Sequence, residues 1–261
     1  MPINEYKKFY ENINREKYAS GKDLSKDFFY KELSGFIKKY GLENEKALEV
    51  GSGNGKYQDI VGDYTGADIS ESLSNFYRKK YVVLEENGKY PFPDQNFDLI
   101  FTNSVFEHIP NIDFALKETL RVLKNKGYLF FHMAWQARPW AAGGYAVRPY
   151  SDFDFKGKLI KALIPLRENL FFRICLVMPK RIIWALAFFL DRDNFRNELK
   201  YKKLKPNYGT YWSSDSDACN SVDPFAMILY FKANNCKIMN YPGLWKAFFV
   251  RSGILMVSKN I

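Results

Sequence analysis

Three glycines after an apolar segment have the spacing of a ligand-binding turn. In ALEVGSGNGKY, Glu49 precedes Gly51, Gly53 and Gly55. Glycines directly after a strand allow a tight turn and let a ligand approach the backbone closely. A dinucleotide site has the pattern G-x-G-x-x-G, whose third glycine would fall here on Lys56. The segment therefore favours a ligand with an amino-acid part and no pyrophosphate, with a purely structural turn as the alternative.

A second acidic residue follows at a distance that suits a ribose. Asp68, in YTGADIS, ends the next apolar segment nineteen positions after Glu49. An acidic side chain at the end of the second strand of an α/β sheet can accept hydrogen bonds from a ribose diol. The glycine turn and Asp68 together predict a ligand that carries both an amino-acid part and a ribose.

A third stretch, EENGKYPFPDQNFDLIFTNSVFEHIP from residue 85 to residue 110, completes a set of motifs. With it the chain resembles the class I S-adenosylmethionine-dependent methyltransferases, in the branch that acts on small molecules. That family has an acidic residue after the third strand, then PFPD, an FDLI-type fourth strand and an EHI segment. It also has a helix that ends like ETLRVLKNKGYLFF. The resemblance covers about residues 40–133 and, less closely, the last two strands.

The resemblance implies that the glycine turn holds S-adenosylmethionine. Gly51, Gly53 and Gly55 would pass under the methionine part, and Glu49 would support the turn. Asp68 would hold the ribose hydroxyls. The product would be S-adenosylhomocysteine, and no metal is expected.

Five further residues match positions where the family contacts its cofactor. Ile69 would pack on the adenine, and Glu86 and Asn87 lie where the family contacts it with an acidic side chain and a backbone amide. The family often has Asp-Ala there, so this chain departs from the pattern at both positions. Asn103 and Ser104, after the fourth strand, would line the cofactor floor near the transferred methyl group.

The chain has two histidines, and both are expected at the carboxyl edge of the sheet: His108 and His132. Methyl transfer from a sulfonium is an in-line displacement, so positioning of the acceptor atom does most of the work. A hydroxyl acceptor is also helped by a general base, which a neutral imidazole supplies near pH 7. Both histidines are therefore candidate catalytic residues, with a structural role in the EHI segment as the alternative for His108.

The residues after the fifth strand could recognise the acceptor. Arginine binds phosphate through two parallel hydrogen bonds, and aromatic rings can stack on a base or a sugar face. Aspartates there could hydrogen-bond sugar hydroxyls or support the arginines, whereas Asp223 before Pro224 is expected to cap a helix. A packed loop with surface arginines is the alternative. The predicted substrate-binding residues are Trp135, Arg138, Tyr145, Arg148, Tyr150, Asp215 and Asp217.

Short apolar segments alternate with amphipathic ones over residues 41–133, the expected cofactor-binding core. This pattern predicts an α/β fold: a Rossmann-like doubly wound sheet, mostly parallel, with an antiparallel C-terminal strand. Helices are expected after the glycine turn and over Leu73–Lys80. Residues 1–40 are expected to form a helical cap, and residues 134–224 a mainly helical and loop insert that binds the acceptor. Residues 225–261 would supply the final helix and strands.

Charge divides the chain at residue 133. Residues 1–133 carry 19 Lys and Arg against 20 Asp and Glu, and residues 134–261 carry 20 against 9. The net charges are −1 and +11, so the second half has the whole excess and favours an anionic partner. A solvated basic face is the alternative, and it is the preferred interpretation of KYKKLK at residues 200–205.

These observations predict an O-methyltransferase whose acceptor is a small anionic molecule. A nucleotide-activated sugar, or a phosphate or phosphoramidate group for bacterial capsular polysaccharide, is favoured, because the last part of the chain is similar to methyltransferases of surface-polysaccharide synthesis. The first alternative is a lipid or quinone headgroup at a membrane surface, suggested by the apolar, basic segment Leu170–Leu190. Burial of that segment against the sheet is nevertheless expected. The second alternative is a non-catalytic scaffold that binds S-adenosylmethionine.

Several other classes are not expected. Thr102–Val105 replaces the (D/N)PP(Y/F) motif of enzymes that methylate base amines, so nucleic acid is not an expected partner. Arg173, Lys180 and Arg181 interrupt the most apolar segment and argue against a membrane span. A charged N-terminal segment and three widely spaced cysteines give no secretory signal and no disulfide framework, which predicts a cytoplasmic protein. The oligomeric state stays open.

Overall fold

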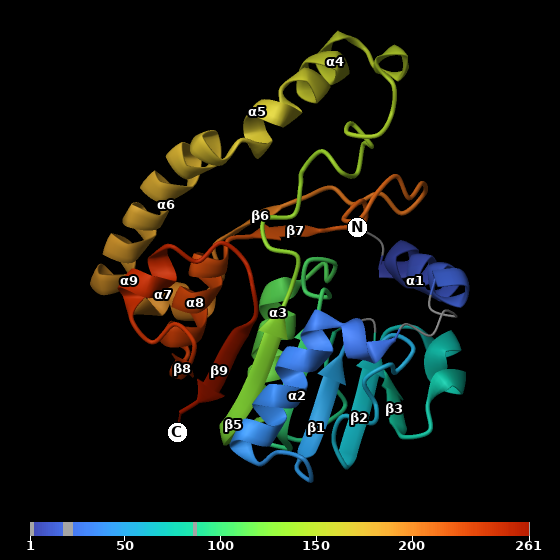
Figure 1. Ribbon diagram of the computed structural model, residues 1–261, viewed down its shortest axis with the longest axis vertical. Helices are drawn as coiled ribbons and strands as arrows, with labels where there is room; N and C mark the ends of the chain where they lie inside the picture. The colour runs from blue at the N-terminus through green and yellow to red at the C-terminus, as the bar shows by residue number, and fades with distance from the viewer. Residues whose placement is uncertain (1–2, 18–22, 86–87, 261) are drawn as a thin grey trace.

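Seven strands form the central sheet of the computed structural model, which describes residues 3–17, 23–85 and 88–260 (Figure 1). Their order is β3-β2-β1-β4-β5-β9-β8. The strands are β1 (Lys46–Val50), β2 (Asp63–Asp68), β3 (Lys80–Val83), β4 (Phe97–Asn103), β5 (Leu123–His132), β8 (Cys236–Ile238) and β9 (Leu255–Lys259). β1 to β5 pair in parallel, and β9 is antiparallel to both neighbours. The predicted fold class is confirmed.

The sheet is buried on both faces, as parallel sheets require. Successive side chains of a strand point to opposite faces, so neighbouring residues enter different cores. Leu48 and Ile100 belong to one core, and Ala47 and Leu99 to the other. The first core includes side chains of α3 and α8, and the second includes side chains of α2. These helices are α2 (Phe28–Tyr40), α3 (Ile112–Val122) and α8 (Pro224–Ala233).

Two predicted helices are wrong. Residues 56–62, after the glycine turn, form turns and bends. The helix predicted over Leu73–Lys80 is replaced by the short 3-10 helix η2 (Glu71–Phe76) and the start of β3. Serine and asparagine side chains compete with the backbone for hydrogen bonds, and three of the four residues in the segment SLSN are of these types.

The insert is built around an arm of three helices. Figure 1 shows α4, α5 and α6 projecting away from the sheet, while the β6–β7 ribbon crosses above the carboxyl ends of the parallel strands. The elements of the insert are η3 (Tyr150–Asp152), α4 (Phe155–Ala162), α5 (Ile164–Glu168), α6 (Leu170–Leu190), α7 (Arg192–Asn197), β6 (Tyr201–Lys203) and β7 (Asn220–Val222). The remaining helices are α1 (Ile3–Lys17), η1 (Leu24–Lys26) and α9 (Leu244–Phe248).

The expected burial of Leu170–Leu190 against the sheet is wrong, because most apolar side chains of α6 are exposed. The helix is anchored by Arg181, which is 1% exposed. Its guanidinium donates to Asp223 at 2.7 Å and to the carbonyl of Val250 at 2.7 Å. Asp223 also accepts a hydrogen bond from the N–H of Phe225, which confirms its predicted role as a helix cap.

Candidate functional site

A cavity of about 500 Å³ lies at the carboxyl ends of β1, β2 and β4. Four predicted cofactor residues line it: Gly51, Asp68, Ile69 and Ser104. This edge is where open α/β sheets bind their ligands. The sequence and the structure thus point to the same position, which we call the cofactor cavity.

The glycine turn exposes backbone where other residues would place a side chain. Gly51, Gly53 and Gly55 have φ angles of 69°, 52° and 68°, in the left-handed region that favours glycine. A Cβ atom on Gly51 would lie 2.3 Å from the side chain of Val105, and one on Gly55 would lie 2.7 Å from the ring of Tyr77. Both spacing and conformation therefore require glycine in this turn.

Asp68 connects the glycine turn to the end of β2. Its carboxylate accepts hydrogen bonds from the N–H groups of Gly53 at 2.9 Å and Ser70 at 3.2 Å. Burial raises the pKa of the Asp68 carboxyl, and these N–H donors oppose that shift. Its oxygen atoms lie at the cavity wall, where hydroxyl groups of a ribose could donate to them.

Glu49 lies on β1, directly before the glycine turn, and is 3% exposed. The hydroxyl of Tyr64 on β2 donates a hydrogen bond to its carboxylate. Burial raises the pKa of Glu49 to about 8. The side chain therefore joins β1 to β2 next to the turn, a position that suits the supporting role predicted for it.

A series of hydrogen bonds orients His132 at the end of β5. Its Nδ1 lies 2.8 Å from Oδ1 of Asn103, whose Nδ2 donates to the hydroxyl of Tyr57 at 3.2 Å. Tyr57 in turn donates to Asp27 at 2.9 Å. Because the amide oxygen of Asn103 faces the ring, Nδ1 carries the proton and Nε2 keeps its lone pair. Burial lowers the pKa of His132, so the imidazole is neutral near pH 7.

Ser104 places Asn103 and His132 beside the cofactor cavity. It lines the cavity with φ 57°, and its N–H donates to the carbonyl oxygen of His132 at 3.0 Å. Asn103 and His132 are not among the described residues that line the cofactor cavity; Asn103, predicted to line the cofactor floor, instead hydrogen-bonds to the candidate base. The predicted adenine contacts Glu86 and Asn87 lie outside the described residues.

His108 lines the cofactor cavity with an acidic partner from the insert. Its Nδ1 lies 3.3 Å from Asp217, and the same carboxylate accepts a hydrogen bond from the hydroxyl of Tyr10 at 2.6 Å. Asp215, the other aspartate predicted to bind substrate, also lines this cavity. The structure therefore brings together His108, Asp215 and Asp217, whereas His132 has a neutral amide partner.

Glu107 is a site residue that sequence reasoning missed. It is fully buried, and its Oε1 accepts a hydrogen bond from the N–H of Ala134 at 2.9 Å. Its Oε2 has no hydrogen-bond partner among the described residues, although Glu107 lines the cofactor cavity. Burial raises the pKa of this carboxyl. The EHI motif carried the signal for Glu107, because its acidic residue directly precedes the candidate histidine His108.

Helix α1 closes the cofactor cavity, a contribution that the sequence analysis assigned to no residue. Tyr6 and Tyr10 line the cavity, and Phe9 packs on Tyr208 with 5.1 Å between ring centroids. Glu11 accepts hydrogen bonds from two N–H groups at the start of η2, which attaches the helix to the sheet end. The aromatic residues were visible in the sequence, but their partners lie about 200 positions further along.

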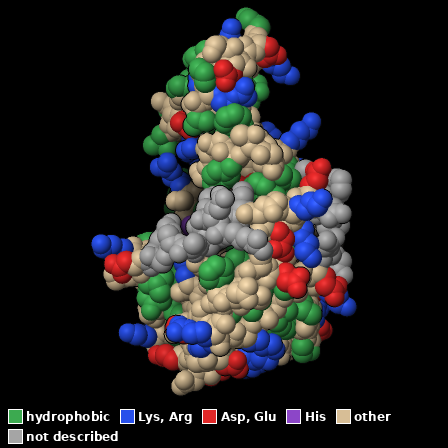
Figure 2. All heavy atoms as spheres, turned by 90° about the vertical axis from the view of Figure 1, so that its right-hand side faces the viewer, with side chains coloured by type: hydrophobic (Ala, Val, Ile, Leu, Met, Phe, Trp, Pro, Cys, Tyr) green, Lys and Arg blue, Asp and Glu red, His purple; other side chains and the backbone are tan. Residues whose placement is uncertain are grey.

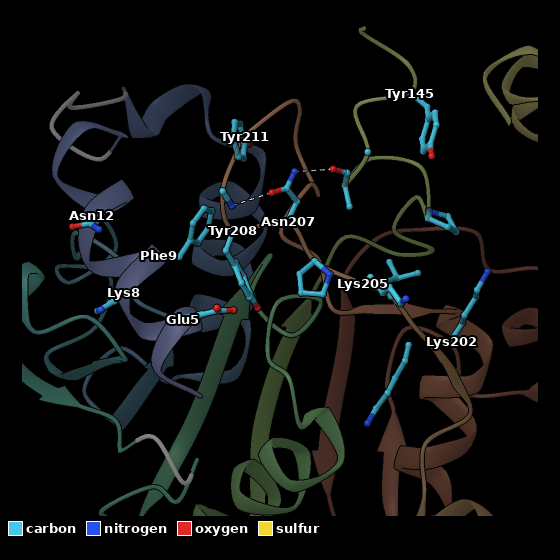
Figure 3. Close-up of a pocket in the computed structure, with 17 residues that line it drawn as sticks. Glu5, Lys8, Phe9, Asn12, Tyr145, Lys202, Lys205, Asn207, Tyr208 and Tyr211 are labelled. Atoms are coloured by element: carbon cyan, nitrogen blue, oxygen red, sulfur yellow. Dashed lines mark hydrogen bonds between the residues drawn. The ribbon is translucent and has the colours of Figure 1, made fainter. Parts of the chain in front are cut away.

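A second cavity, of about 1060 Å³, lies between α1 and the loop that follows β6 (Figure 3). Four lysines line it: Lys8 from α1 and Lys202, Lys203 and Lys205 from β6 and the following loop. Figure 3 shows Lys8 on one wall and Lys202 and Lys205 on the opposite one. Tyr211 lines this cavity and the cofactor cavity. We call this second cavity the lysine cavity. Lysines of the run KYKKLK, predicted to be only a solvated face, thus line a cavity.

The remaining predicted substrate residues have different environments. Tyr145 lines the lysine cavity. Arg148 lies within 5 Å of the rings of Phe153 and Trp212 and pairs with Asp152 at 3.2 Å, so it organises its own loop.

Three of these residues contact other parts of the insert and sheet. Arg138 pairs with Glu168 at 3.2 Å. Nε1 of Trp135 donates to the carbonyl of Gly253 at 2.7 Å. The ring of Tyr150, which is 48% exposed, lies 5.2 Å from Nζ of Lys161 on α4.

Comparisons with known proteins agree with the cavity at the sheet edge. Residues 48–131 match the family described as methyltransferase domain. An uncharacterized protein of Methanocaldococcus jannaschii is 31% identical over 137 residues, 49% of this chain and 60% of that protein. A fatty-acid O-methyltransferase of Mycolicibacterium smegmatis is 30% identical over 102 residues, 34% and 37% of the two chains. A ubiquinone biosynthesis O-methyltransferase of Coxiella burnetii is 25% identical over 146 residues, which are 46% of this chain and 62% of that protein.

The chain spans less than two thirds of each of these relatives. Among solved structures, an S-adenosylmethionine dependent methyltransferase from Mesorhizobium loti is similar with a TM-score of 0.39 and 14% identity. That similarity covers 46% of this chain and 60% of the other. A phosphoethanolamine N-methyltransferase from Haemonchus contortus has a TM-score of 0.38 and 15% identity, covering 52% and 33%.

Proposed function

We propose that the protein transfers a methyl group from S-adenosylmethionine to an oxygen atom of a small anionic acceptor, since residues 48–131 match the methyltransferase-domain family. One observation carries the choice of acceptor. Tyr6 and Tyr10 of α1 line the cofactor cavity, Lys8 and Phe9 of the same helix line the lysine cavity, and the two cavities share Tyr211. A molecule with its anionic end among the lysines could therefore extend toward the methyl donor.

The cofactor is S-adenosylmethionine, and the residues of the cofactor cavity fit it. The glycine turn leaves backbone open where a Cβ atom would collide with Val105, which allows the methionine part to approach closely. Asp68 offers carboxylate oxygens to a ribose, and Ile69 offers an apolar side chain to the adenine. Among the described residues, no group of three His, Cys, Asp or Glu side chains is placed to hold a metal ion.

The bound cofactor would supply an electrophilic methyl group, which an acceptor oxygen attacks in line. If that oxygen belongs to a hydroxyl group, Nε2 of His132 would accept its proton, since Asn103 fixes the proton on Nδ1. If it belongs to a phosphate, it is already anionic and needs little base catalysis. His108 and Asp217 would then orient the acceptor rather than deprotonate it.

We further propose a phosphorylated acceptor, with a nucleotide-activated sugar or a phosphate or phosphoramidate group of surface polysaccharide synthesis as the favoured class. Four lysines support a multiply charged group, because each ammonium can donate to phosphate oxygens. Tyr145 also lines the lysine cavity, and its ring is stacked on Phe153 with 4.8 Å between centroids, which fixes its position there. The volume of the lysine cavity is large enough for such a molecule.

A lipid or quinone headgroup is the second candidate acceptor, and two observations favour it. The relatives from M. smegmatis and C. burnetii are named for fatty-acid methylation and ubiquinone biosynthesis. The arm formed by α4, α5 and α6 also exposes many apolar side chains. A scaffold that binds the cofactor without catalysis is the third reading.

Release of S-adenosylhomocysteine tests these candidates with a panel of nucleotide sugars, phosphorylated intermediates, quinones and lipids. We expect turnover with the phosphorylated set. The double variant Lys202→Glu, Lys203→Glu should raise KM for that acceptor about tenfold or more, because it reverses charge beside the phosphate. Lys237→Glu, at an exposed lysine on the edge strand β8, is the control and should leave KM unchanged.

His132→Ala distinguishes the two kinds of acceptor oxygen. It should lower kcat about 100-fold for a hydroxyl acceptor and only slightly for a phosphate oxygen. Turnover only with lipids or quinones would replace the proposal with the second candidate. Tight cofactor binding without turnover on any acceptor would support the scaffold.

A further inference from the structure

Helix α6 has an apolar stripe along its whole length. Residues spaced by three and four positions share one face of a helix. On α6 this row consists of Phe172, Leu176, Pro179, Ile183, Leu186 and Leu190. Its 21 residues give the stripe a length of about 30 Å.

The stripe faces outward. Leu176, Ile183 and Leu186 are 66%, 63% and 60% exposed, and Leu190 at the end of the helix is 87% exposed. Phe171, Phe189 and Ile182 flank the row and are 70%, 73% and 51% exposed. At 100° per residue, these side chains span roughly 140° of the helix surface, which is wider than the narrow seam of a coiled coil. The surface therefore suits a broad apolar medium better than a single partner helix.

The charges of the arm have one dominant sign. Residues 155–190 contain seven Lys and Arg and one acidic residue, Glu168. Glu168 pairs with Arg138 outside the arm, and Arg181 is neutralised by Asp223. Lys156, Lys158, Arg167 and Lys180 are exposed. Figure 2 shows blue basic, green hydrophobic and some red acidic side chains next to one another on the upper projection.

We infer that the arm formed by α4, α5 and α6 docks on the surface of an anionic lipid bilayer. Apolar side chains of α6 enter the interface, and lysines and arginines of the arm contact acidic headgroups. A second copy of this chain would bring a surface of the same positive sign, which opposes pairing of two arms. In the described part of the chain, no helix is long and apolar enough to cross a membrane, so α6 would lie along the surface.

The arm is attached to the body at both ends, so docking would fix the orientation of the whole molecule. At one end, Nζ of Lys161 donates to the carbonyl oxygen of Tyr145, which lines the lysine cavity, at 2.9 Å. At the other end, Arg181 is held by Asp223 in the core. Arg173 on α6 also donates to Gln136, directly after the sheet, at 2.7 Å. The inference concerns binding alone and does not depend on the acceptor.

Vesicle flotation with the full chain tests this inference. We expect binding to vesicles of 70% phosphatidylcholine and 30% phosphatidylglycerol, and at least tenfold weaker binding to phosphatidylcholine alone. The variant Leu176→Glu, Ile183→Glu should lose binding at least tenfold, and Lys156→Glu, Lys158→Glu several-fold per charge. Phe28→Glu is the matched control, because Phe28 is also 66% exposed but lies on α2; its binding should equal that of the wild type.

Circular dichroism and S-adenosylmethionine affinity establish that each variant is folded. Absence of wild-type binding to the anionic vesicles at low salt overturns the inference. Equal binding to neutral and anionic vesicles contradicts the role of the basic residues. Light scattering that shows a dimer, abolished by Leu176→Glu, Ile183→Glu, with no vesicle binding, would assign the stripe to a second copy instead.

Discussion

The cofactor-binding region and the insert treat apolar side chains in opposite ways. In residues 41–133 the apolar side chains of the strands are buried between helices on both faces of the sheet. In residues 155–190 the large apolar side chains of α6 are mostly exposed, although the helix is as apolar as a core segment. The first region buries its own apolar surface, whereas α6 leaves its apolar surface exposed and available to bind another surface. Local pattern alone does not distinguish these two situations.

The position of the insert is expected to depend on one buried ion pair, between Arg181 and Asp223. Removing this pair should have the largest effect that we predict. Arg181→Met leaves Asp223 and the carbonyl of Val250 without their guanidinium partner. The free energy of unfolding should fall by about 3–5 kcal/mol, since breaking a buried pair leaves an uncompensated charge. Urea denaturation of the variant and the wild type measures this loss of free energy of unfolding.

The matched control for that variant is Arg78→Met. Arg78 pairs with Asp59 on the surface, where the two side chains are 75% and 65% exposed. Exposed ion pairs contribute about 0–1 kcal/mol. Equal losses for the two variants would show that α6 is not anchored by Arg181.

The cofactor region is expected to depend on backbone geometry instead. Gly51→Ala places a Cβ atom 2.3 Å from Val105 at a φ of 69°. We expect the affinity for S-adenosylmethionine to fall about 100-fold by isothermal titration calorimetry, because the turn must shift away from the cofactor. Gly41→Ala is the control: its φ is 65°, but a Cβ atom there has open space, so only strain remains. Loss of affinity in both variants would assign the effect to general destabilisation.

Much of the fold and the cofactor cavity could be predicted from sequence because both depend on short-range patterns. β1, the glycine turn and Asp68 fall within about 20 positions, and the alternation of short apolar and amphipathic segments indicates a parallel sheet. The segment Leu73–Lys80 is not helical, as its serine- and asparagine-rich start explains, and the 3-10 helix η2 is held by a distant carboxylate, because Glu11 accepts the N–H groups at the start of η2. Such a partner is invisible to a local pattern.

The lysine cavity could not be predicted for the same physical reason. Lys8 comes from α1 and Lys202 from β6, nearly 200 positions apart, so no spacing links them. The exposure of α6 could not be predicted from the sequence either, because an apolar segment of helix length has the same composition whether it lies in a core or on a surface. The anchor Arg181 inside that run argued against a membrane span but did not indicate its partner Asp223.

The smallest effect we predict is a pH dependence that belongs to the cofactor region alone. Burial raises the pKa of Glu49 to about 8, above its ordinary value of 4.5. The folded chain therefore binds more protons than the unfolded chain between these values, and the free energy of unfolding falls as pH rises through that window. From pH 6 to pH 8 the loss from this group should be on the order of 2 kcal/mol.

Glu49→Gln isolates that contribution, because the amide is neutral at every pH and its oxygen can still accept the hydrogen bond from Tyr64. Urea denaturation of both proteins at pH 6, 7 and 8 gives the difference between them. The variant should be less sensitive to pH and should gain stability relative to the wild type as pH rises. Parallel curves would mean that Glu49 is already ionised in the folded chain at pH 6. In that case the β1–β2 connection beneath the glycine turn would be an ionic hydrogen bond, and the contrast with the ion-pair anchor of the insert would disappear.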